Sequence, residues 1–338
     1  MKFLIIQTAF IGDVILTLPM VQVLKRKYSE STVDFICIPK TAPILDNNPY
    51  INEVIVYDKR GEEQGLGAFI KLMKKIRKRG YDTVISPHRY LRSTLISGFS
   101  GAKQTIAFDN STFSGLYKNK VEYGKTHEIQ RNLSLLKPLG IEETEIIKPE
   151  LFPGADDICA VDKIISGLAI KSDSKFITAA PGSEWFTKRF PKDKFVTLFN
   201  IMDKSGIKIV LIGSKGDFKL CEYIVANSTN NNIYNYAGKL DLLQSAELIR
   251  RSALLITNDS APLHLANATG TKVIAIFGAT NQDFGFYPYG IADKVFEISD
   301  LGCRPCSIHG GQRCPTGTFE CMLKIDEKEI ADAILNKC

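Results

Sequence analysis

The chain has 338 residues, of which 44% are hydrophobic, and a net charge of +6. The length exceeds what one hydrophobic core usually supports, and the ordinary apolar fraction excludes a disordered or fibrous chain, so we expect two globular domains. No apolar stretch approaches the roughly 18 residues of a membrane span, and the apolar start is too short for a signal peptide. The sequence therefore argues against a transmembrane segment and predicts a cytoplasmic protein.

The positive charge is uneven along the chain. Residues 1–150 hold 22 Lys and Arg against 16 Asp and Glu, whereas the remaining residues hold 21 of each kind. Such an excess indicates an acidic partner for the N-terminal half, such as an anionic lipid surface, a phosphorylated sugar or a nucleic acid. A slightly basic solvated surface is the alternative explanation.

The N-terminal half alternates strand-like and helix-like stretches. Its apolar runs are continuous, which is typical of strands that are covered on both faces. We predict strands at 3–8, 33–39, 54–58, 83–87 and 105–108, and helices at 14–27 and 68–79.

The same alternation restarts in the C-terminal half. We predict strands at 176–181, 208–213, 254–258 and 273–278, and helices at 192–204, 217–225 and 242–251. Strand–helix alternation twice over predicts two doubly wound α/β domains joined near residues 150–172. We assign residues 1–155 and 156–322 to these domains, and 323–338 to a terminal helix, amphipathic over 326–336, that packs back on one of them.

A polar turn follows the first predicted strand. Gly12 permits a tight turn there, and Asp13 falls in the first turn of the next helix. Asp at a helix start often serves only as a cap. The alternative is a carboxylate that is held at a ligand site as a general base. The turn has no G-x-G-x-x-G pattern, which argues against a dinucleotide-binding domain.

A second polar turn follows the strand at 254–258. Ser260 is placed to cap the next helix, and Pro262 fits its first turn. Backbone N–H groups at such a helix start can cradle an anion such as pyrophosphate. An ordinary capped helix explains these two residues but not the polar pair Asn258-Asp259 with His264 one turn further on, so we predict an anion site.

A third polar segment, residues 181–191, follows the strand at 176–181. Gly182 and Ser183 allow a ligand to approach the backbone closely, while Lys188 and Arg189 supply positive charge for a diphosphate. A solvent-exposed Lys-Arg pair is the alternative interpretation.

Together these segments resemble the ADP-heptose–lipopolysaccharide heptosyltransferases, glycosyltransferase family 9, over nearly the full length of the chain. The similar motifs are Gly12-Asp13-Val14 with Leu18-Pro19, Leu91-Arg92-Ser93, Pro181-Gly182-Ser183 with Thr187-Lys188-Arg189, Asn258-Asp259-Ser260 through His264, and Gly270-Thr271 before the strand at 273–278. No single motif is decisive, but their order and spacing are specific.

The resemblance implies a GT-B fold, in which two Rossmann-like domains face a central cleft, the N-terminal one holding the acceptor and the C-terminal one the nucleotide sugar. It implies an inverting transfer of heptose from ADP-heptose to a lipopolysaccharide or lipooligosaccharide inner-core acceptor at the inner-membrane surface. Catalysis would need no metal, and nucleic acid would not be a partner. The enzyme would be cytoplasmic, with peripheral contact to the cytosolic face of the inner membrane as an option.

The resemblance also implies roles for single residues. Asp13, with Gly12 beside it in the acceptor site, matches the general base that deprotonates the acceptor hydroxyl, and Lys188 matches the lysine that neutralises the leaving diphosphate. The other donor-binding positions are matched by Ser183, Thr187, Asp217, Leu240, Asp259, Ser260, Ala261 and His264, of which Asp217 and Leu240 are expected at the adenosine. Ala261 is a departure, because the family usually has Gly there.

Four of the eight cysteines lie close together in the sequence, namely Cys303, Cys306, Cys314 and Cys321. In a cytoplasmic protein this spacing indicates free thiols or a metal site rather than disulfides. Zinc and iron both fit four thiolates. Heptosyltransferase II-like members of the resembled family have a similar Cys-rich loop. We expect a structural role for these residues, either around a metal or as reduced thiols.

The helix predicted at 68–79 has apolar residues on one side and cations elsewhere. This is typical of a packed helix with a solvated basic face, and contact with anionic lipid headgroups is the alternative. Better candidates for binding acidic groups of the acceptor are His88, Arg89, Arg92 and Arg131, since guanidinium groups match the geometry of carboxylate and phosphate.

Other functions fit parts of this pattern. The first is a member of the same family that uses another nucleotide sugar, or a protein acceptor as autotransporter heptosyltransferases do. The second is a noncatalytic protein that binds a nucleotide or a sugar. The third is a redox Rossmann enzyme. The presence of Asp13 together with Lys188 favours a catalyst over a binding protein. The missing G-x-G-x-x-G pattern argues against the redox enzyme.

Overall fold

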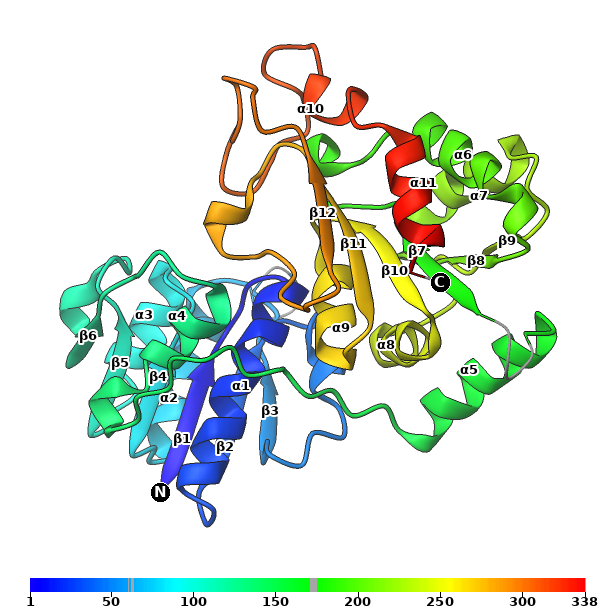
Figure 1. The fold of residues 1–338 in the computed structure, drawn as a ribbon. Coiled ribbons are helices and arrows are strands. Elements are labelled where there is room, and N and C mark those ends of the chain that lie inside the picture. Colours follow the sequence, from blue (N-terminus) through cyan, green and yellow to red (C-terminus); the bar gives the residue numbers. More distant parts are fainter. Residues whose placement is uncertain (60, 62–63, 171–174, 338) are drawn as a thin grey trace. The chain divides into compact units, whose positions relative to one another are not determined.

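The computed structural model describes residues 1–59, 61, 64–170 and 175–337. It divides the chain into two compact units, Met1–Phe152 and Pro153–Cys338. Each unit contains a parallel sheet that has six strands in these described ranges (Figure 1). The predicted fold class, two doubly wound α/β halves, is confirmed.

In the first unit, helices cover both faces of the sheet. Its strands are β1 (Lys2–Ile6), β2 (Thr32–Cys37), β3 (Glu53–Val56), β4 (Thr83–Ser86), β5 (Gln104–Phe108) and β6 (Asn119–Val121), and its helices are α1 (Ile11–Lys27), α2 (Leu66–Lys78), α3 (Leu91–Gly98) and α4 (Glu128–Ser134). Leu4 and Ile6 of β1 pack with Phe69 of α2 and Ile96 of α3. Alternate strand residues point to the other face, where α1 packs with α4 (Figure 1).

The second unit repeats this arrangement. Its strands are β7 (Phe176–Ala180), β8 (Lys208–Leu211), β9 (Ile233–Asn235), β10 (Leu254–Asn258), β11 (Lys272–Phe277) and β12 (Lys294–Glu297). Its helices are α5 (Ala155–Gly167), α6 (Lys192–Ile201), α7 (Phe218–Asn227), α8 (Leu242–Arg251), α9 (Ala261–Thr269), α10 (Glu320–Leu323) and α11 (Glu327–Leu335). One buried core joins alternate strand residues to α6, α7 and α11, as Ile256, Phe195, Cys221 and Ile330 illustrate.

The two sheets share one strand order. The first reads β3-β2-β1-β4-β5-β6 and the second, from the opposite end, β9-β8-β7-β10-β11-β12. The chain therefore changes direction across each sheet between β1 and β4, and again between β7 and β10. At such a switch point the connections leave to opposite sides, which opens a crevice beyond the carboxyl ends of the two central strands. Ligand sites are expected there.

Each strand that the sequence predicts is present as a strand of one of these sheets. Three edge strands, β6, β9 and β12, were not predicted, because they have only 3, 3 and 4 residues and are partly exposed. Helix α5 was not predicted either. It lies in the segment expected to join the domains and has Val161 as its one buried residue among those described.

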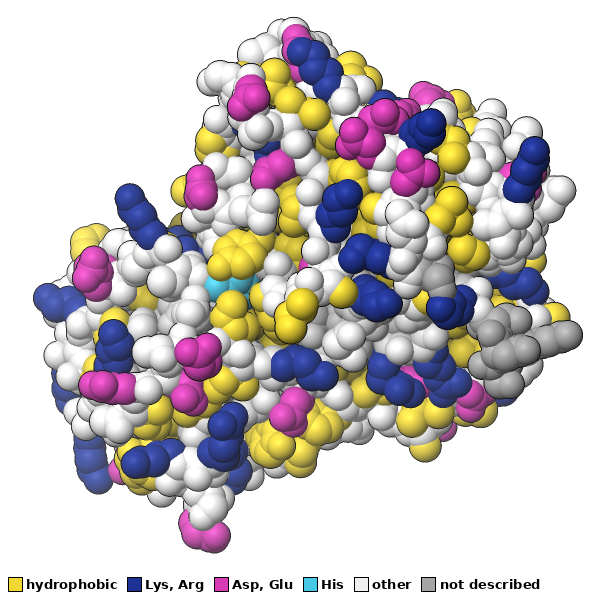
Figure 2. Space-filling view, in the orientation of Figure 1, with side chains coloured by type: hydrophobic (Ala, Val, Ile, Leu, Met, Phe, Trp, Pro, Cys, Tyr) yellow, Lys and Arg dark blue, Asp and Glu magenta, His cyan; other side chains and the backbone are white. Residues whose placement is uncertain are grey.

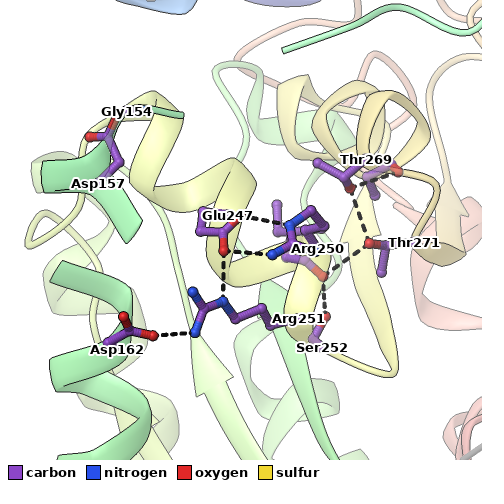
Figure 3. A network of polar contacts seen from close by, with 11 residues as sticks. Gly154, Asp157, Asp162, Glu247, Arg250, Arg251, Ser252, Thr269 and Thr271 are labelled. Atoms are coloured by element: carbon purple, nitrogen blue, oxygen red, sulfur yellow. Dashed lines mark hydrogen bonds and ion pairs between the residues drawn. The ribbon is translucent and has the colours of Figure 1, made fainter. Parts of the chain in front are cut away.

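Within the second unit, an ion pair links α5 to a charged network on α8 (Figure 3). Arg251 of α8 donates to Asp162 of α5 and to Glu247 of its own helix, and Arg250 donates to the same Glu247. The Glu247 side chain is only 3% exposed. Beyond the end of α9, the Thr271 hydroxyl donates to a backbone carbonyl of α8. Helix α8 is therefore the element that ties α5 and α9 together.

No helix within the described ranges is both long and apolar enough to cross a bilayer. Figure 2 shows Lys and Arg side chains spread over the visible face, among Asp and Glu side chains, rather than gathered in one patch.

Candidate functional site

At the switch point of the second sheet, one buried amide holds the loop that follows β7. Asn258 is the last residue of β10 and is fully buried. Its Oδ1 accepts a hydrogen bond from the Phe190 backbone N–H at 3.0 Å, and its Nδ2 donates to the Pro181 carbonyl at 2.7 Å. Because both ends of the loop bind one side chain, Asn258 fixes the segment that carries Lys188.

Lys188 forms an ion pair with Asp259 at this edge of the sheet. Its Nζ lies 2.6 Å from Asp259 Oδ2, and the two side chains are 13% and 8% exposed. The Thr280 hydroxyl, beyond the end of β11, donates to the same carboxylate oxygen at 2.6 Å. Burying a charge is costly unless it is paired, so these contacts hold the ammonium in one place beside the start of α9.

Helix α9 begins where the sequence predicts. Ser260 is the N-cap residue and Pro262 lies in the first turn. The Ser260 hydroxyl does not cap the helix, and instead lies 3.3 Å from the carbonyl oxygen of Asn258. The backbone N–H groups of Ser260 and Ala261 donate to no group that the structure describes. Free N–H groups and the positive end of the helix dipole attract anions, so this turn with Lys188 has the geometry of an anion site.

Asp217 lies against the same loop. A Cβ atom at Gly182 would come within 2.2 Å of Asp217 Oδ1, so the close approach requires glycine at that position. The Asp217 carboxylate also accepts hydrogen bonds from the backbone N–H and the hydroxyl of Ser214, at 2.8 and 2.7 Å. The predicted adenosine contact is thus placed beside the predicted diphosphate loop, where it also caps a short turn.

The other predicted donor residues surround this edge. The carbonyl of Ser183 accepts a hydrogen bond from Arg189 Nε at 2.7 Å, and Thr187 is buried. His264 is buried inside α9. Leu240 is half-buried after β9, two residues before the start of α8. All of them lie on segments that follow the carboxyl ends of strands.

At the switch point of the first sheet, the segments after β1 and β4 meet. Thr8 Oγ1 and Ser93 Oγ lie 3.2 and 2.7 Å from His88 Nδ1. Burial, together with the positive charges of Lys59 and Arg89, lowers the pKa of His88 to about 3. The imidazole is therefore neutral at physiological pH. Its contacts join β1, β4 and α3, which suits a positioning role better than binding of an acidic group.

Asp13 occupies the first turn of α1, after the carboxyl end of β1. Its Oδ2 accepts a hydrogen bond from the Phe10 backbone N–H at 3.2 Å, and its carbonyl accepts one from the Thr17 hydroxyl at 2.8 Å. The carboxylate is half-buried, and Gly12 beside it is buried. Asp13 thus makes a capping contact at the start of α1. It also lies at the carboxyl end of β1, where a general base for a bound ligand would be needed.

Tyr123 holds two of the predicted arginines. The guanidinium carbons of Arg89 and Arg131 lie 4.2 and 4.7 Å from the centre of its ring. Arg131 also pairs with buried Glu128 at 2.6 Å, and burial raises the pKa of this carboxyl. Arg92 instead donates to a tyrosine hydroxyl after β3, on the other side of β1. The structure therefore brings Arg89 and Arg131 together and leaves Arg92 apart.

Three residues at these sites were not predicted from the sequence, namely Thr280, Tyr123 and Glu128. Thr280 had a signal, because it is a polar residue shortly after a predicted strand. Tyr123 and Glu128 had none, since their partners come from other loops and only the strand order brings them together.

The four cysteines do not form a ligand set. Among the residues that the structure describes, no three His, Cys, Asp or Glu side chains are gathered so that they could hold a metal ion. Cys303 is exposed and Cys321 is buried. A hydrogen bond from Thr316 is the main cause that lowers the pKa of Cys314. As placed, the thiols do not fit a metal, and the metal site stays a prediction from the spacing.

The chain is similar in sequence and fold to known proteins. The sequence model of glycosyltransferase family 9 (heptosyltransferase) matches residues 69–312. Lipopolysaccharide heptosyltransferase 3 of Escherichia coli K12 is 29% identical over 287 residues, which cover 81% of each chain. The glycosyl transferase family 9 structure from Veillonella parvula superposes with a TM-score of 0.88 at 22% identity, covering 99% of this chain and 96% of that one. E. coli ADP-heptose lps heptosyltransferase II superposes with a TM-score of 0.81 at 21% identity, covering 100% and 98%. These likenesses confirm the predicted GT-B fold.

Proposed function

The chain belongs to glycosyltransferase family 9 (heptosyltransferase) and is a glycosyltransferase, and we propose that it transfers heptose from ADP-heptose to a lipopolysaccharide inner-core acceptor. The transfer inverts the sugar carbon and uses no catalytic metal. The names of the E. coli relative and of the similar E. coli structure support the donor and the acceptor. The observation that carries the proposal is the Lys188–Asp259 pair at the start of α9.

The donor site works by electrostatics. As the bond between heptose and diphosphate breaks, negative charge builds up on the departing ADP. Lys188 and the backbone N–H groups of Ser260 and Ala261 stabilise that charge, and groups fixed in advance do so without reorganising. Asp259 and Thr280 keep the ammonium in place before the donor arrives. These groups supply the positive charge that a divalent metal ion supplies in sites where a metal neutralises the departing diphosphate.

The acceptor site lies on the first unit, Met1–Phe152, and the donor site on the second. Asp13 accepts the proton of the attacking hydroxyl as general base, and its place at the switch point supports this role. Arg89 binds an anionic group of the acceptor. Arg131, neutralised by Glu128, supports the ring on which Arg89 rests.

The proposal also covers the basic face of α2 and the four cysteines. The exposed cations of α2 contact anionic lipid headgroups on the cytosolic face of the inner membrane, where the acceptor lies. The four cysteines have a structural role only.

The test is a donor and acceptor screen. Binding of ADP, UDP and GDP is measured by calorimetry on the wild type and on Lys188→Met, and transfer onto truncated lipopolysaccharides is read by mass spectrometry, with EDTA and with added Mg²⁺. We expect ADP to bind most tightly, Lys188→Met to lose about tenfold in affinity, and one heptose to be added at the same rate in both buffers. Tighter binding of UDP or GDP, or the absence of any product, contradicts the proposal.

A further inference from the structure

The Cys-rich segment, residues 303–321, bonds directly to the turn that carries Lys188. The Gly311 backbone N–H donates to Thr187 Oγ1 at 2.8 Å, and the Thr187 backbone N–H donates to the Gly311 carbonyl at 3.0 Å. These two reciprocal bonds fasten the residue next to Lys188 to a segment far along the chain. Both residues are outside the regular sheet, so the bonds are not a by-product of strand pairing.

Further contacts widen this attachment. Gln312 Nε2 donates to the Glu184 carbonyl at 3.1 Å. The rings of Phe186 and Phe319 stack with their centres 5.4 Å apart. The turn Phe186–Lys188 is a single 3-10 turn, and its three residues alone do not fix a long lysine side chain. The Cys-rich segment therefore provides much of the support for this turn.

Gly310 is the point of closest approach. Its φ of +84° is a conformation that favours glycine, and a Cβ atom there would lie 3.1 Å from Thr187 Oγ1, 3.2 Å from Lys188 Cγ and 3.3 Å from Trp185 Cβ. The Ser307 hydroxyl accepts from the Gly310 N–H at 2.8 Å and donates to its carbonyl at 2.9 Å, which holds the glycine in this position. The backbone of Gly310 thus packs on the stem of Lys188.

The first residues of the Cys-rich segment support Asp259, the other partner of the ion pair, through the turn after β11. Arg304, whose side chain is 4% exposed, donates to the backbone carbonyls of Gly278 and Thr280. The Cys306 N–H donates to the Ala279 carbonyl at 2.8 Å. These bonds fix the turn after β11, from which the Thr280 hydroxyl reaches Asp259. One segment therefore orients the supports of both Lys188 and Asp259.

We propose that the Cys-rich segment, residues 303–321, is a positioning element for the Lys188–Asp259 pair and that Gly310 is the positioning residue through which it acts on Lys188. The inference rests on the proposed function, because it assigns Lys188 to the diphosphate of the donor. It gives this segment a role in the reaction that does not depend on whether the thiols hold a metal. A site that is held in advance binds charge without reorganising, which is what the attachment achieves.

The test compares two glycines of this segment. Gly310→Ala introduces a methyl group against Lys188 at a positive φ. Gly317→Ala introduces the same strain, since Gly317 has a φ of +72°, but its Cβ would meet nothing within 4 Å. Both changes are made in the wild type and in Lys188→Met, thermal unfolding verifies that each variant is folded, and the affinity for ADP is measured by calorimetry.

We expect Gly310→Ala to weaken ADP binding about tenfold in the wild type and by less than about twofold in Lys188→Met, because the effect passes through Lys188. Gly317→Ala should bind ADP like its parent. Unchanged binding in Gly310→Ala, or an equal loss in both backgrounds, overturns the inference while leaving the proposed donor site intact. If Lys188→Met itself binds ADP as the wild type does, the proposed donor site fails, and the inference fails with it.

Discussion

At the scale of single residues, the two switch points are held by different chemistry. Lys188 and Asp259 are a charged pair of nearly buried side chains, so each needs the other. His88 is held as a neutral ring by two hydroxyl groups, Thr8 and Ser93, because burial and nearby cations disfavour its charged form. The first arrangement keeps a charged pair beside the start of α9, whereas the second fixes the geometry of the loops around it.

The neutral state of His88 predicts a pH dependence of stability. Its pKa is about 3 in the folded protein, against roughly 6.5 in an unfolded chain. The folded state therefore binds fewer protons, so the contribution of His88 to stability is fully present above pH 6.5 or so and is lost as the pH falls towards 3. Between pH 7.5 and 5, urea unfolding should show a smaller loss of stability for His88→Asn than for the wild type. Equal losses in the two proteins contradict this account.

At the scale of elements, helix α8 connects its neighbours through one buried carboxylate. Burial by itself raises the pKa of Glu247, but the hydrogen bonds from Arg250 and Arg251 outweigh it and hold this pKa below its usual value. Glu247 thus carries a charge in a place where only those arginines make the charge tolerable. Asp162 of α5 receives Arg251 at the exposed side of the same network.

This difference in exposure predicts unequal effects of two similar substitutions. Glu247→Gln should lower the free energy of unfolding by about 1–3 kcal/mol, since the nearly buried carboxylate that accepts hydrogen bonds from two arginines becomes a neutral amide. Asp162→Asn should cost about 0–1 kcal/mol, because the carboxylate is 55% exposed. Urea unfolding of both variants is the measurement. If the two variants lose similar amounts of unfolding free energy, buried Glu247 contributes no more to stability than exposed Asp162, which contradicts the prediction.

Helix α2 has one face in the core and cations on the other. Phe69, Leu72 and Ile76 are buried. The exposed cations are Lys71, Lys74, Lys75, Arg77 and Lys78. A solvated basic face needs no partner, whereas a surface next to an anionic bilayer gains about 1 kcal/mol for each cation.

Vesicle binding distinguishes these two interpretations of α2. The double variant Lys71→Gln, Lys75→Gln should bind vesicles of anionic phospholipid about 30-fold more weakly than the wild type, as two lost cations imply. Vesicles of neutral phospholipid serve as the control. If the variant and the wild type bind anionic vesicles equally, α2 is a solvated helix and has no part in membrane contact.

At the scale of the whole molecule, the chain contains the same doubly wound sheet twice, and each candidate site lies at a switch point of its sheet. The sequence predicts the two doubly wound halves, because continuous apolar runs identify buried parallel strands and polar residues directly after them indicate ligand edges. The strand order, and with it the two switch points, comes from the structure. The amino-acid pattern makes Asp13, Lys188 and Asp259 candidates, although their roles come from the family resemblance. It does not single out Tyr123 and Gly310, since their contacts depend on which loops the strand order brings together.

The shortest elements also escaped prediction, for a physical reason. Strands β6 and β9 have three residues each and lie at sheet edges, where partial exposure removes the apolar signal. Helix α5 buries one side chain, Val161, among those described and forms one ion pair with α8, so its apolar pattern is too weak to distinguish it from a linker in the sequence. Such elements depend on contacts that a linear pattern does not contain.

The central claim is that the switch point of the first unit activates the acceptor and that of the second binds the donor. The most direct test is Asp13→Asn, which keeps a capping oxygen but removes the base, assayed for heptose transfer and for ADP affinity. We expect the transfer rate to fall by about 10²- to 10⁴-fold, with ADP affinity unchanged. Transfer at the wild-type rate in this variant would contradict the account.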